Sequence, residues 1–381
     1  MPSDGPLRVA ISVAAFLEAP DFGGPVAKVA MLAEGLAARG HDVTVLTADY
    51  GTNRSRVPAH VTNVDGYTAR YLRTIARYRW SPVLAPGALR KVPWDFDVVH
   101  VCGLRDGLGF ALMREARRRG VPFVLEPLGM VPAQLRNVVL KNVVDRFVTK
   151  REFATASVVI ATSNEERRRL EAEYAVPRLA IRPNPIATPA TAPADPPDER
   201  DGVHIVFVGR VCRTKNLLAL VEAVSKLDGV RLTIAGPDDR DGTSEKLRAL
   251  VATLPRGRVE IRGWVSSAER DALIASAHLC VLPSLTENFG TFAVEAARGR
   301  RAVVVTSTTG VAEFLGDAAV IVEPDALSLR AAFARLVDDR ALRDSLAARG
   351  YERVKELTVD RVAALQEQIY RDALTSVDHF P

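Results

Sequence analysis

The sequence predicts an α/β protein with two domains in tandem, each a parallel sheet with helices on both faces. The first observation is the length of 381 residues, which exceeds what one hydrophobic core usually serves. The second is the recurrence of short β-branched runs separated by helical patterns. The third is a proline-rich segment, residues 183–201, that divides these runs into two series. Ligands of such sheets bind beyond the carboxyl ends of the strands, so we expect the site in a cleft between the domains.

Each series of runs supplies the strands of one sheet. The first covers residues 7–12, 43–47, 97–101, 121–125 and 157–161. The second covers residues 205–209, 231–235, 258–262, 279–283, 302–306 and 319–323. Pro25 suits the first turn of a helix that Gly40 ends. Ser163 and Ser266 are each followed three residues later by a glutamate, which is the pattern of a capping box.

These signals set the expected domain boundaries. Residues 1–185 form the first domain, residues 186–201 the linker and residues 202–358 the second domain. Residues 359–381 contain an amphipathic helix long enough to cross back to the first domain.

The composition is that of an ordinary globular protein, with 48% apolar and 25% charged residues. The three cysteines lack the paired spacing of a disulfide framework or a zinc site. The N-terminal apolar run is flanked by charges and makes a poor signal peptide, and no run approaches the ~20 apolar residues of a membrane span. We therefore expect a cytoplasmic protein, either free or on the inner face of the membrane.

The net charge of +5 is unevenly spread along the chain. Between residues 54 and 91 eight basic residues face one acid, and tyrosines and tryptophans are interleaved with them up to residue 94. This composition favours peripheral contact with anionic lipid headgroups, or a phosphorylated acceptor, through residues 54–94. An ordinary solvated basic surface is the alternative. No nucleic-acid motif accompanies the charge, so nucleic acid is not an expected partner.

The most informative segment is residues 283–299, which follows a short apolar strand and leads into a helix. Gly290 lies at the junction, where backbone N–H groups at the start of the helix favour a phosphate. Glu287 and Glu295 lie eight residues apart on either side of the junction, and their carboxylates can accept hydrogen bonds from sugar hydroxyls. This layout favours a sugar-nucleotide site; the alternative is a pair of solvated surface glutamates.

Two more loops follow predicted strands and carry suitable residues. Gly23 and Gly24 lack a β-carbon, so the backbone there can approach a diphosphate closely. The segment VGRVCRTKN presents Arg210 and Lys215, two cations that can neutralise phosphates. All three loops fall at the carboxyl ends of predicted strands and would face one cleft.

Together these segments resemble the retaining glycosyltransferases of family four. The resemblance spans nearly the whole chain and is carried by the Gly-Gly loop, VGRVCRTKN, RPNPI, the Glu-x7-Glu unit and TSTTGVAEF. It implies the GT-B fold, in which two Rossmann-like domains face a cleft. It also implies a nucleoside-diphosphate sugar as co-substrate, with a UDP- or GDP-sugar favoured, and a hydroxyl acceptor that the sequence does not identify.

The resemblance further implies roles for individual residues. Arg210 and Lys215 would bind the donor diphosphate, and Glu287 would contact the transferred sugar. Glu295 would hold the ribose hydroxyls. The other donor-binding residues would be Gly23, Gly24, Arg262, Gly263, Trp264, Asn288, Phe289, Gly290 and Thr291, with residues 262–264 seating the base.

The N-terminal half departs from the family pattern. His100 is kept in VVHVCGL as a candidate catalytic residue, but Cys102 and Leu128 stand where relatives often carry histidines. A core histidine is the alternative interpretation of His100. In the mechanism that the resemblance implies, the leaving phosphate takes the acceptor proton, so no metal and no further cofactor is expected. The competing hypotheses are a sugar-nucleotide epimerase of similar fold and a two-domain sugar-binding protein without catalytic activity.

Overall fold

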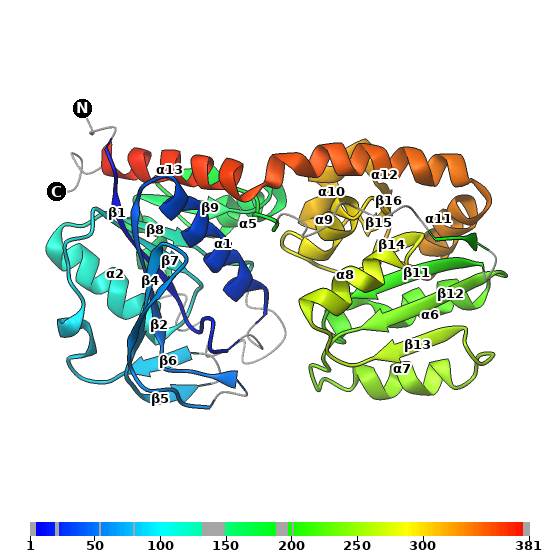
Figure 1. The fold of residues 1–381 in the computed structure, drawn as a ribbon, viewed down its shortest axis with the longest axis horizontal. Coiled ribbons are helices and arrows are strands. Elements are labelled where there is room, and N and C mark those ends of the chain that lie inside the picture. The colour runs from blue at the N-terminus through cyan, green and yellow to red at the C-terminus, as the bar shows by residue number, and fades with distance from the viewer. Residues whose placement is uncertain are drawn as a thin grey trace. The chain divides into compact units, whose positions relative to one another are not determined.

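Two parallel-rich sheets, one from each half of the chain, organise the computed structural model of the protein (Figure 1). The structure describes residues 5–19, 23–52, 55–78, 81–131, 149–187, 197–199 and 202–375. The first compact unit comprises Met1–Ala187 with Leu357–Pro381, and the second comprises Thr188–Glu356. Most of the expected linker falls on residues 188–196 and 200–201, outside the described residues. The predicted fold class, two parallel-sheet α/β units, is confirmed.

The first unit is built on an eight-stranded sheet with the order β10-β9-β8-β7-β1-β2-β4-β3. All neighbouring pairs are parallel except β3 with β4. A separate antiparallel pair joins β5 to β6. The strands are β1 (Arg8–Val13), β2 (Asp42–Ala48), β3 (Val61–Val64), β4 (Tyr67–Leu72), β5 (Thr74–Tyr78), β6 (Ser81–Leu84), β7 (Val98–Cys102), β8 (Phe123–Glu126), β9 (Val158–Ala161) and β10 (Leu179–Ile181).

The helices described in this unit are α1 (Gly24–Ala38), α2 (Gly107–Arg119), α4 (Lys150–Thr155), α5 (Asn164–Glu173) and α13 (Val359–Thr375). Two of them, α1 and α5, begin at start signals found in the sequence. Pro25 lies in the first turn of α1, where a missing N–H costs nothing. Ser163 caps α5 by accepting from Glu166 N, and the Glu166 carboxylate holds the backbone of Thr162 and Gly129.

The C-terminal helix α13 packs along α1 within the first unit (Figure 1). Gly35 allows this contact, because a β-carbon there would lie 2.8 Å from the β-carbon of Ala363. The Arg39 guanidinium on α1 also pairs with Glu367 at 2.9 Å. The helix that closes the chain is therefore part of the first unit's core.

The second unit is a six-stranded parallel sheet with the order β13-β12-β11-β14-β15-β16. Its strands are β11 (Val203–Val208), β12 (Val230–Ala235), β13 (Val259–Arg262), β14 (Leu279–Leu282), β15 (Ala302–Thr306) and β16 (Val320–Val322). Its helices are α6 (Leu217–Ser225), α7 (Thr243–Val251), α8 (Ser267–Ala275), α9 (Thr291–Arg298), α10 (Gly310–Leu315), α11 (Ala326–Asp338) and α12 (Arg340–Val354). Ser266 and Glu269 form the predicted reciprocal capping box of α8.

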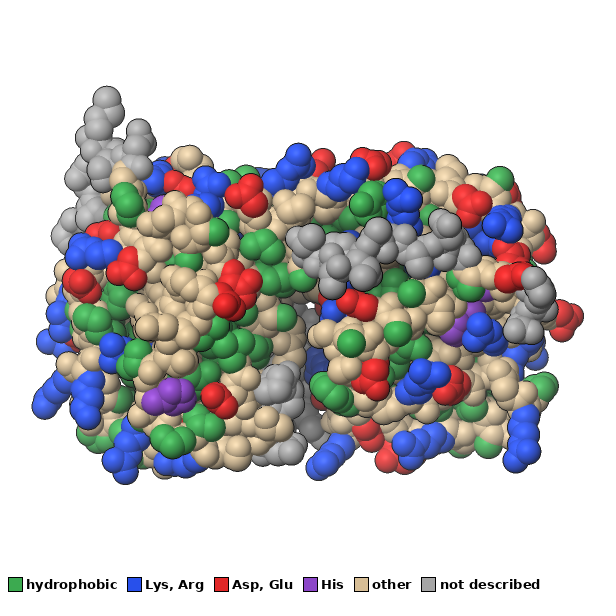
Figure 2. Space-filling model, in the orientation of Figure 1, with side chains coloured by type: hydrophobic (Ala, Val, Ile, Leu, Met, Phe, Trp, Pro, Cys, Tyr) green, Lys and Arg blue, Asp and Glu red, His purple; other side chains and the backbone are tan. Residues whose placement is uncertain are grey.

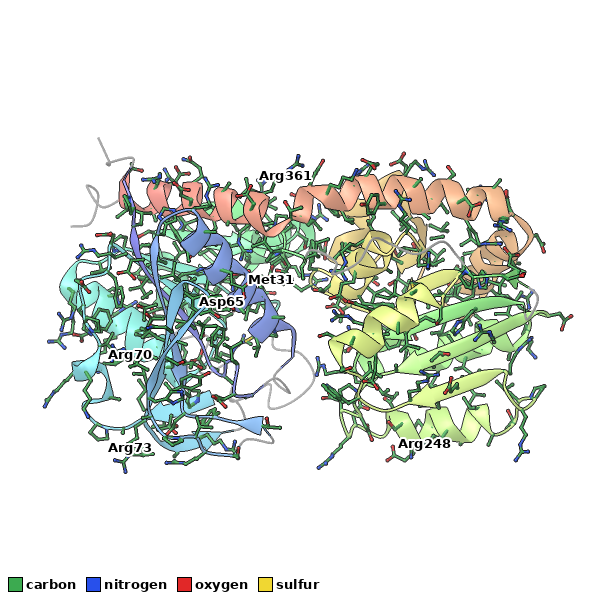
Figure 3. The ribbon with its side chains drawn as sticks, viewed as in Figure 1. Met31, Asp65, Arg70, Arg73, Arg248 and Arg361 are labelled. Carbon is green, nitrogen blue, oxygen red and sulfur yellow. The ribbon has the colours of Figure 1, made fainter. Side chains whose placement is uncertain are left out.

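The basic stretch of the first unit lies on β4, β5, β6 and the segments beside them. Figure 2 shows arginine and lysine side chains along the lower edge of this unit, where Figure 1 draws β5 and β6. Arg70 and Arg73, labelled in Figure 3, belong to this region, and Arg73 is exposed. Ile75 and Val83 on the β5–β6 pair are 58% and 46% exposed, so apolar side chains accompany the charges.

Candidate functional site

Three loops of the second unit meet because their strands are neighbours in the sheet. β11, β14 and β15 lie side by side and are parallel, so the loops that follow them emerge at the same edge. The backbone joins these loops directly: Leu285 N donates to Thr214 O at 2.8 Å, and Gly310 N donates to Glu287 O at 3.0 Å. The loop between β14 and α9, residues 283–290, is called the Glu287 loop below, and its backbone is hydrogen-bonded to the loops on both sides of it.

Lys215 and Glu287 form an ion pair within this cluster. Lys215 comes from the loop after β11 and Glu287 from the loop after β14, 72 residues apart in the sequence. Their side chains are 14% and 23% exposed, so both are sheltered and still open to solvent. The two residues that the family resemblance assigns to the diphosphate and the sugar thus lie in contact, and their roles remain predictions.

Gly290 shapes the start of α9 beside this pair. Its φ of 94° lies in the left-handed region, and an added β-carbon would meet Leu282 at 2.6 Å and Val311 at 2.9 Å. Phe289 is buried just before it, and α9 begins at Thr291. The turn therefore requires glycine, and the first N–H groups of α9 carry the positive end of its dipole.

Glu295 lies on α9 and pairs with Arg270 of α8 at 3.1 Å. Burial raises the pKa of the Glu295 carboxyl, and Arg270 opposes this effect. The side chain is only 13% exposed. Its expected contact with a ribose remains a prediction, and the partner it has in the structure, Arg270, was missed by the sequence reasoning.

Of the other predicted residues of the second unit, Asn288 lies in the loop between Glu287 and Gly290, Arg210 follows β11, and residues 262–264 lie at the end of β13. Arg210 is 61% exposed and pairs with Asp239 at 3.2 Å. Arg262 pairs with Glu260, Gly263 O accepts from Gly236 N, and Trp264 is 63% exposed. β12 separates β11 from β13 in the sheet, and Arg210 and residues 262–264 have contacts of their own, separate from the Lys215–Glu287 pair.

A cavity of about 350 Å³ opens beside α8 rather than around Lys215 and Glu287. It is lined by His204, Arg231, Thr233, Glu260, Arg262, Glu269, Ala272, Leu273 and Ser276. Burial lowers the pKa of His204 to about 4, and its ring nitrogens contact Thr233 Oγ1 and Ser276 O. The cavity shares only Arg262 with the predicted site, so we base the site on the contacts between the loops.

In the first unit the glycine turn opens α1. Gly23 has a φ of 86° and caps the helix, and Gly24 is its first residue. Residues 20–22, just before the turn, lie outside the described residues. A diphosphate contact at Gly23 and Gly24 remains a prediction.

His100 is fully buried in the middle of β7. Its Nδ1 lies 2.9 Å from the Tyr370 hydroxyl of α13, and its Nε2 lies 3.4 Å from Glu126 Oε2. Burial lowers the pKa of His100, which favours the neutral ring. These contacts favour the core-histidine alternative, and its catalytic role remains untested.

Glu126 is the centre of a buried charge cluster that the sequence reasoning missed. Its carboxylate pairs with Lys28 of α1 through Oε1 and with Arg182, after β10, through Oε2 at 2.5 Å. Burial alone would raise the pKa of the Glu126 carboxyl, but the Arg182 and Lys28 cations hold it well below its usual range. The sequence signals were a glutamate ending an apolar strand and the arginine of RPNPI.

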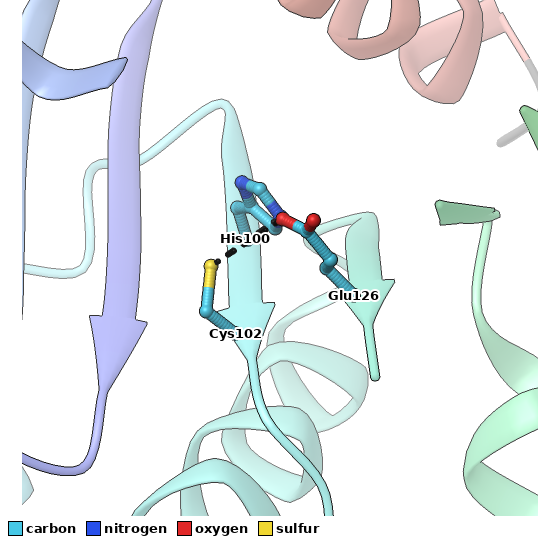
Figure 4. Close-up of side chains that lie close together, drawn as sticks. All are labelled: His100, Cys102 and Glu126. Atoms are coloured by element: carbon cyan, nitrogen blue, oxygen red, sulfur yellow. Dashed lines mark hydrogen bonds and ion pairs between the residues drawn. The ribbon is translucent and has the colours of Figure 1, made fainter. Parts of the chain in front are cut away.

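Ligand atoms of His100, Cys102 and Glu126 lie within 4.8 Å of one another, as a metal site requires (Figure 4). The charges around them do not suit a divalent ion, because Glu126 already holds two fixed cations. Burial also raises the pKa of the Cys102 thiol, which disfavours the thiolate that would bind a metal. We assign no metal to this cluster.

Comparisons with known proteins agree with this architecture. The profile of the glycosyl transferase 4-like domain matches residues 23–187, and that of glycosyl transferases group 1 matches residues 202–339. The chain is 25% identical to the phosphatidylinositol N-acetylglucosaminyltransferase gpi3 subunit of Schizosaccharomyces pombe, over 78% of this chain and 65% of that protein. The chain thus spans a little under two thirds of that relative.

Two solved structures share the fold. Sucrose-phosphate synthase from Thermosynechococcus elongatus superposes with a TM-score of 0.78 at 22% identity, covering 97% of this chain and all of the other. HepE from Anabaena, in complex with UDP and glucose, superposes with a TM-score of 0.71 at 15% identity, covering 96% and 99% of the two chains. The family profiles and these folds support the same assignment: the chain belongs to the family-four glycosyltransferases of the GT-B fold.

Proposed function

We propose that this protein is a retaining glycosyltransferase that moves a sugar from a nucleoside-diphosphate donor to an acceptor hydroxyl. One observation carries the proposal: Lys215 and Glu287 meet three residues before the glycine turn that opens α9. A cation, a carboxylate and helix N–H groups match a diphosphate joined to a sugar.

The charge of each residue indicates its role in the transfer. The Lys215 ammonium and the N–H groups at the start of α9 would stabilise the negative charge that develops on the leaving diphosphate. Glu287 would accept hydrogen bonds from the sugar hydroxyls and orient the anomeric carbon. The leaving phosphate oxygen would take the acceptor proton, so the chain need not supply a general base.

A thermal-shift panel of UDP, GDP, ADP and their sugars tests the donor. We expect a UDP or GDP compound to raise the melting temperature by several degrees, because a ligand at 100 times its Kd stabilises by about 2.7 kcal/mol. HepE, which shares the fold, is described in complex with UDP and glucose. The matched variant Lys215→Met should lose most of the shift. A panel in which no nucleotide moves the wild-type transition would contradict the proposal.

Product analysis with the stabilising donor then separates transfer from epimerisation. A transferase yields a glycoside and a free nucleoside diphosphate, whereas an epimerase yields an isomerised sugar nucleotide. Formation of the second product alone would replace the proposed function by the alternative.

For the acceptor side we propose peripheral contact with an anionic membrane through residues 54–94. The β5–β6 pair presents exposed Ile75 and Val83 beside exposed Arg73, and each cation near an anionic surface contributes about 1 kcal/mol. Among the described residues, no helix is long and apolar enough to cross a bilayer. The gpi3 relative is named for phosphatidylinositol, a membrane lipid.

Liposome sedimentation tests this contact. We expect the protein to sediment with vesicles that contain phosphatidylserine in low salt and to be released in high salt, because salt screens surface charges. The double variant Arg73→Gln/Ile75→Ser should bind less, while Arg248→Gln, at an exposed arginine of the second unit (Figure 3), should bind like wild type. Absence of binding in both salts would favour a small soluble acceptor.

A further inference from the structure

The carbonyl oxygen of Ser284 accepts two side-chain hydrogen bonds where β14 turns into the Glu287 loop. Thr306 Oγ1 donates to it at 2.6 Å and Thr308 Oγ1 at 2.8 Å. Thr306 and Ser284 are fully buried, so water does not compete for the bond between them, whereas the Thr308 bond is partly buried. Two hydroxyl groups from one neighbouring strand end therefore fix a single point of the loop backbone.

The two threonine hydrogen bonds to Ser284 O, called the clamp below, add to other hydrogen bonds that hold the same loop. Leu285 N is held by Thr214 O at 2.8 Å, and Glu287 O is held by Gly310 N at 3.0 Å. Ser284, Leu285 and Glu287 are thus each tied to a neighbouring loop, and the Glu287 side chain ends at Lys215. The loop's conformation depends on contacts from outside it.

Threonine at position 306 is explained better by its hydrogen bond to Ser284 O than by packing. The rest of β15, residues 302–305, is alanine and valine and fully buried. Valine would fill the volume of Thr306 and suits a buried parallel strand. A hydroxyl in this position is buried at a cost unless it has a hydrogen-bond acceptor. Its closer acceptor is the Ser284 carbonyl at 2.6 Å, and Leu282 O lies farther away at 3.4 Å.

We infer that Thr306 and Thr308 are positioning residues of the glycosyl transfer: they fix the Ser284 carbonyl and so place Glu287, three residues later, against Lys215 and the donor sugar. The inference rests on the proposed function of the Lys215–Glu287 pair. Neither threonine is assigned a contact with substrate; both act through the loop backbone. A displacement of about 1 Å at a reacting group can cost 10²-fold in rate, so a clamp of this kind has a measurable effect.

The test compares Thr306→Val/Thr308→Val with wild type in steady-state kinetics and in hydrogen exchange. We expect kcat to fall at least tenfold with a donor KM changed less than about threefold, because the loop is misplaced for reaction while donor contacts elsewhere persist. Exchange in a peptide that covers residues 283–290 should speed up. Thr306→Ser, which keeps the hydroxyl, should retain wild-type kcat within about threefold.

Thr253→Val is the matched control, because Thr253 Oγ1 also donates to a backbone carbonyl, Leu250 O at 2.7 Å, but far along the chain from the loop. It should leave kcat unchanged. Wild-type kcat in the double valine variant would overturn the inference, whether or not exchange increases. If the wild type itself transfers no sugar from any donor, the proposed function fails, and unchanged exchange in the double variant then overturns the clamp separately.

Discussion

Replacing Lys215 with alanine is expected to lower kcat at least tenfold while the melting temperature stays nearly unchanged. The ammonium is the cation that the structure brings to Glu287, three residues before the turn that opens α9. Removing one preorganised donor to a developing negative charge costs on the order of 10²–10³ in rate. The ion pair is partly open to solvent, so its loss costs little stability. Steady-state kinetics with the donor found by thermal shift and a melting curve measure the two effects.

The Lys215 result needs two controls. Lys246→Ala removes an exposed lysine of α7 in the same unit and should keep full activity. Lys215→Ala also frees the Glu287 carboxylate, whose charge would itself repel a diphosphate. The double variant Lys215→Ala/Glu287→Gln removes that charge; if it recovers wild-type kcat, Lys215 serves only to neutralise Glu287 and the proposed role is wrong.

Both sheets could be predicted from the sequence because buried parallel strands appear as continuous apolar runs. The runs at 97–101 and 279–283 correspond to β7 and β14, whose residues are all buried. The sequence reasoning missed β3 to β6, because arginines and tyrosines between residues 54 and 84 mask any apolar pattern there. It also missed β10, a strand of only three residues.

The candidate site could be predicted only where chemistry is local. The turn at Gly290 is visible in the sequence because a strand, a glycine and a helix follow one another. The contact of Lys215 with Glu287 is not visible, since it depends on the order of β11 and β14 in the sheet. The cluster at Glu126 leaves two signals in the sequence, but they could not be joined for the same reason. Its members come from α1, β7, β8, the segment after β10 and α13, and His100 and Tyr370 are 270 residues apart.

Glu126→Gln is expected to lower the free energy of unfolding by about 3–5 kcal/mol, because it leaves Lys28 and Arg182 buried without a counter-charge. Urea denaturation followed by circular dichroism measures the loss. The pH dependence has a defined sign. The pKa of Glu126 is lower in the folded protein, so its stabilising effect is complete above the unfolded pKa of ~4.3 and is lost as the pH falls below it. The variant should lack this component of acid unfolding.

The matched variant is Lys28→Met. The number of buried charges left unpaired differs between the two variants, so their losses in free energy of unfolding should differ. One carboxylate faces two cations, so removing Lys28 leaves a balanced Glu126–Arg182 pair and an apolar side chain of similar length. Lys28→Met should therefore cost much less than Glu126→Gln, since replacing a buried ion by an apolar group is often neutral, whereas leaving one unpaired is not. Equal losses in the two variants would mean that local packing, not charge balance, governs this cluster.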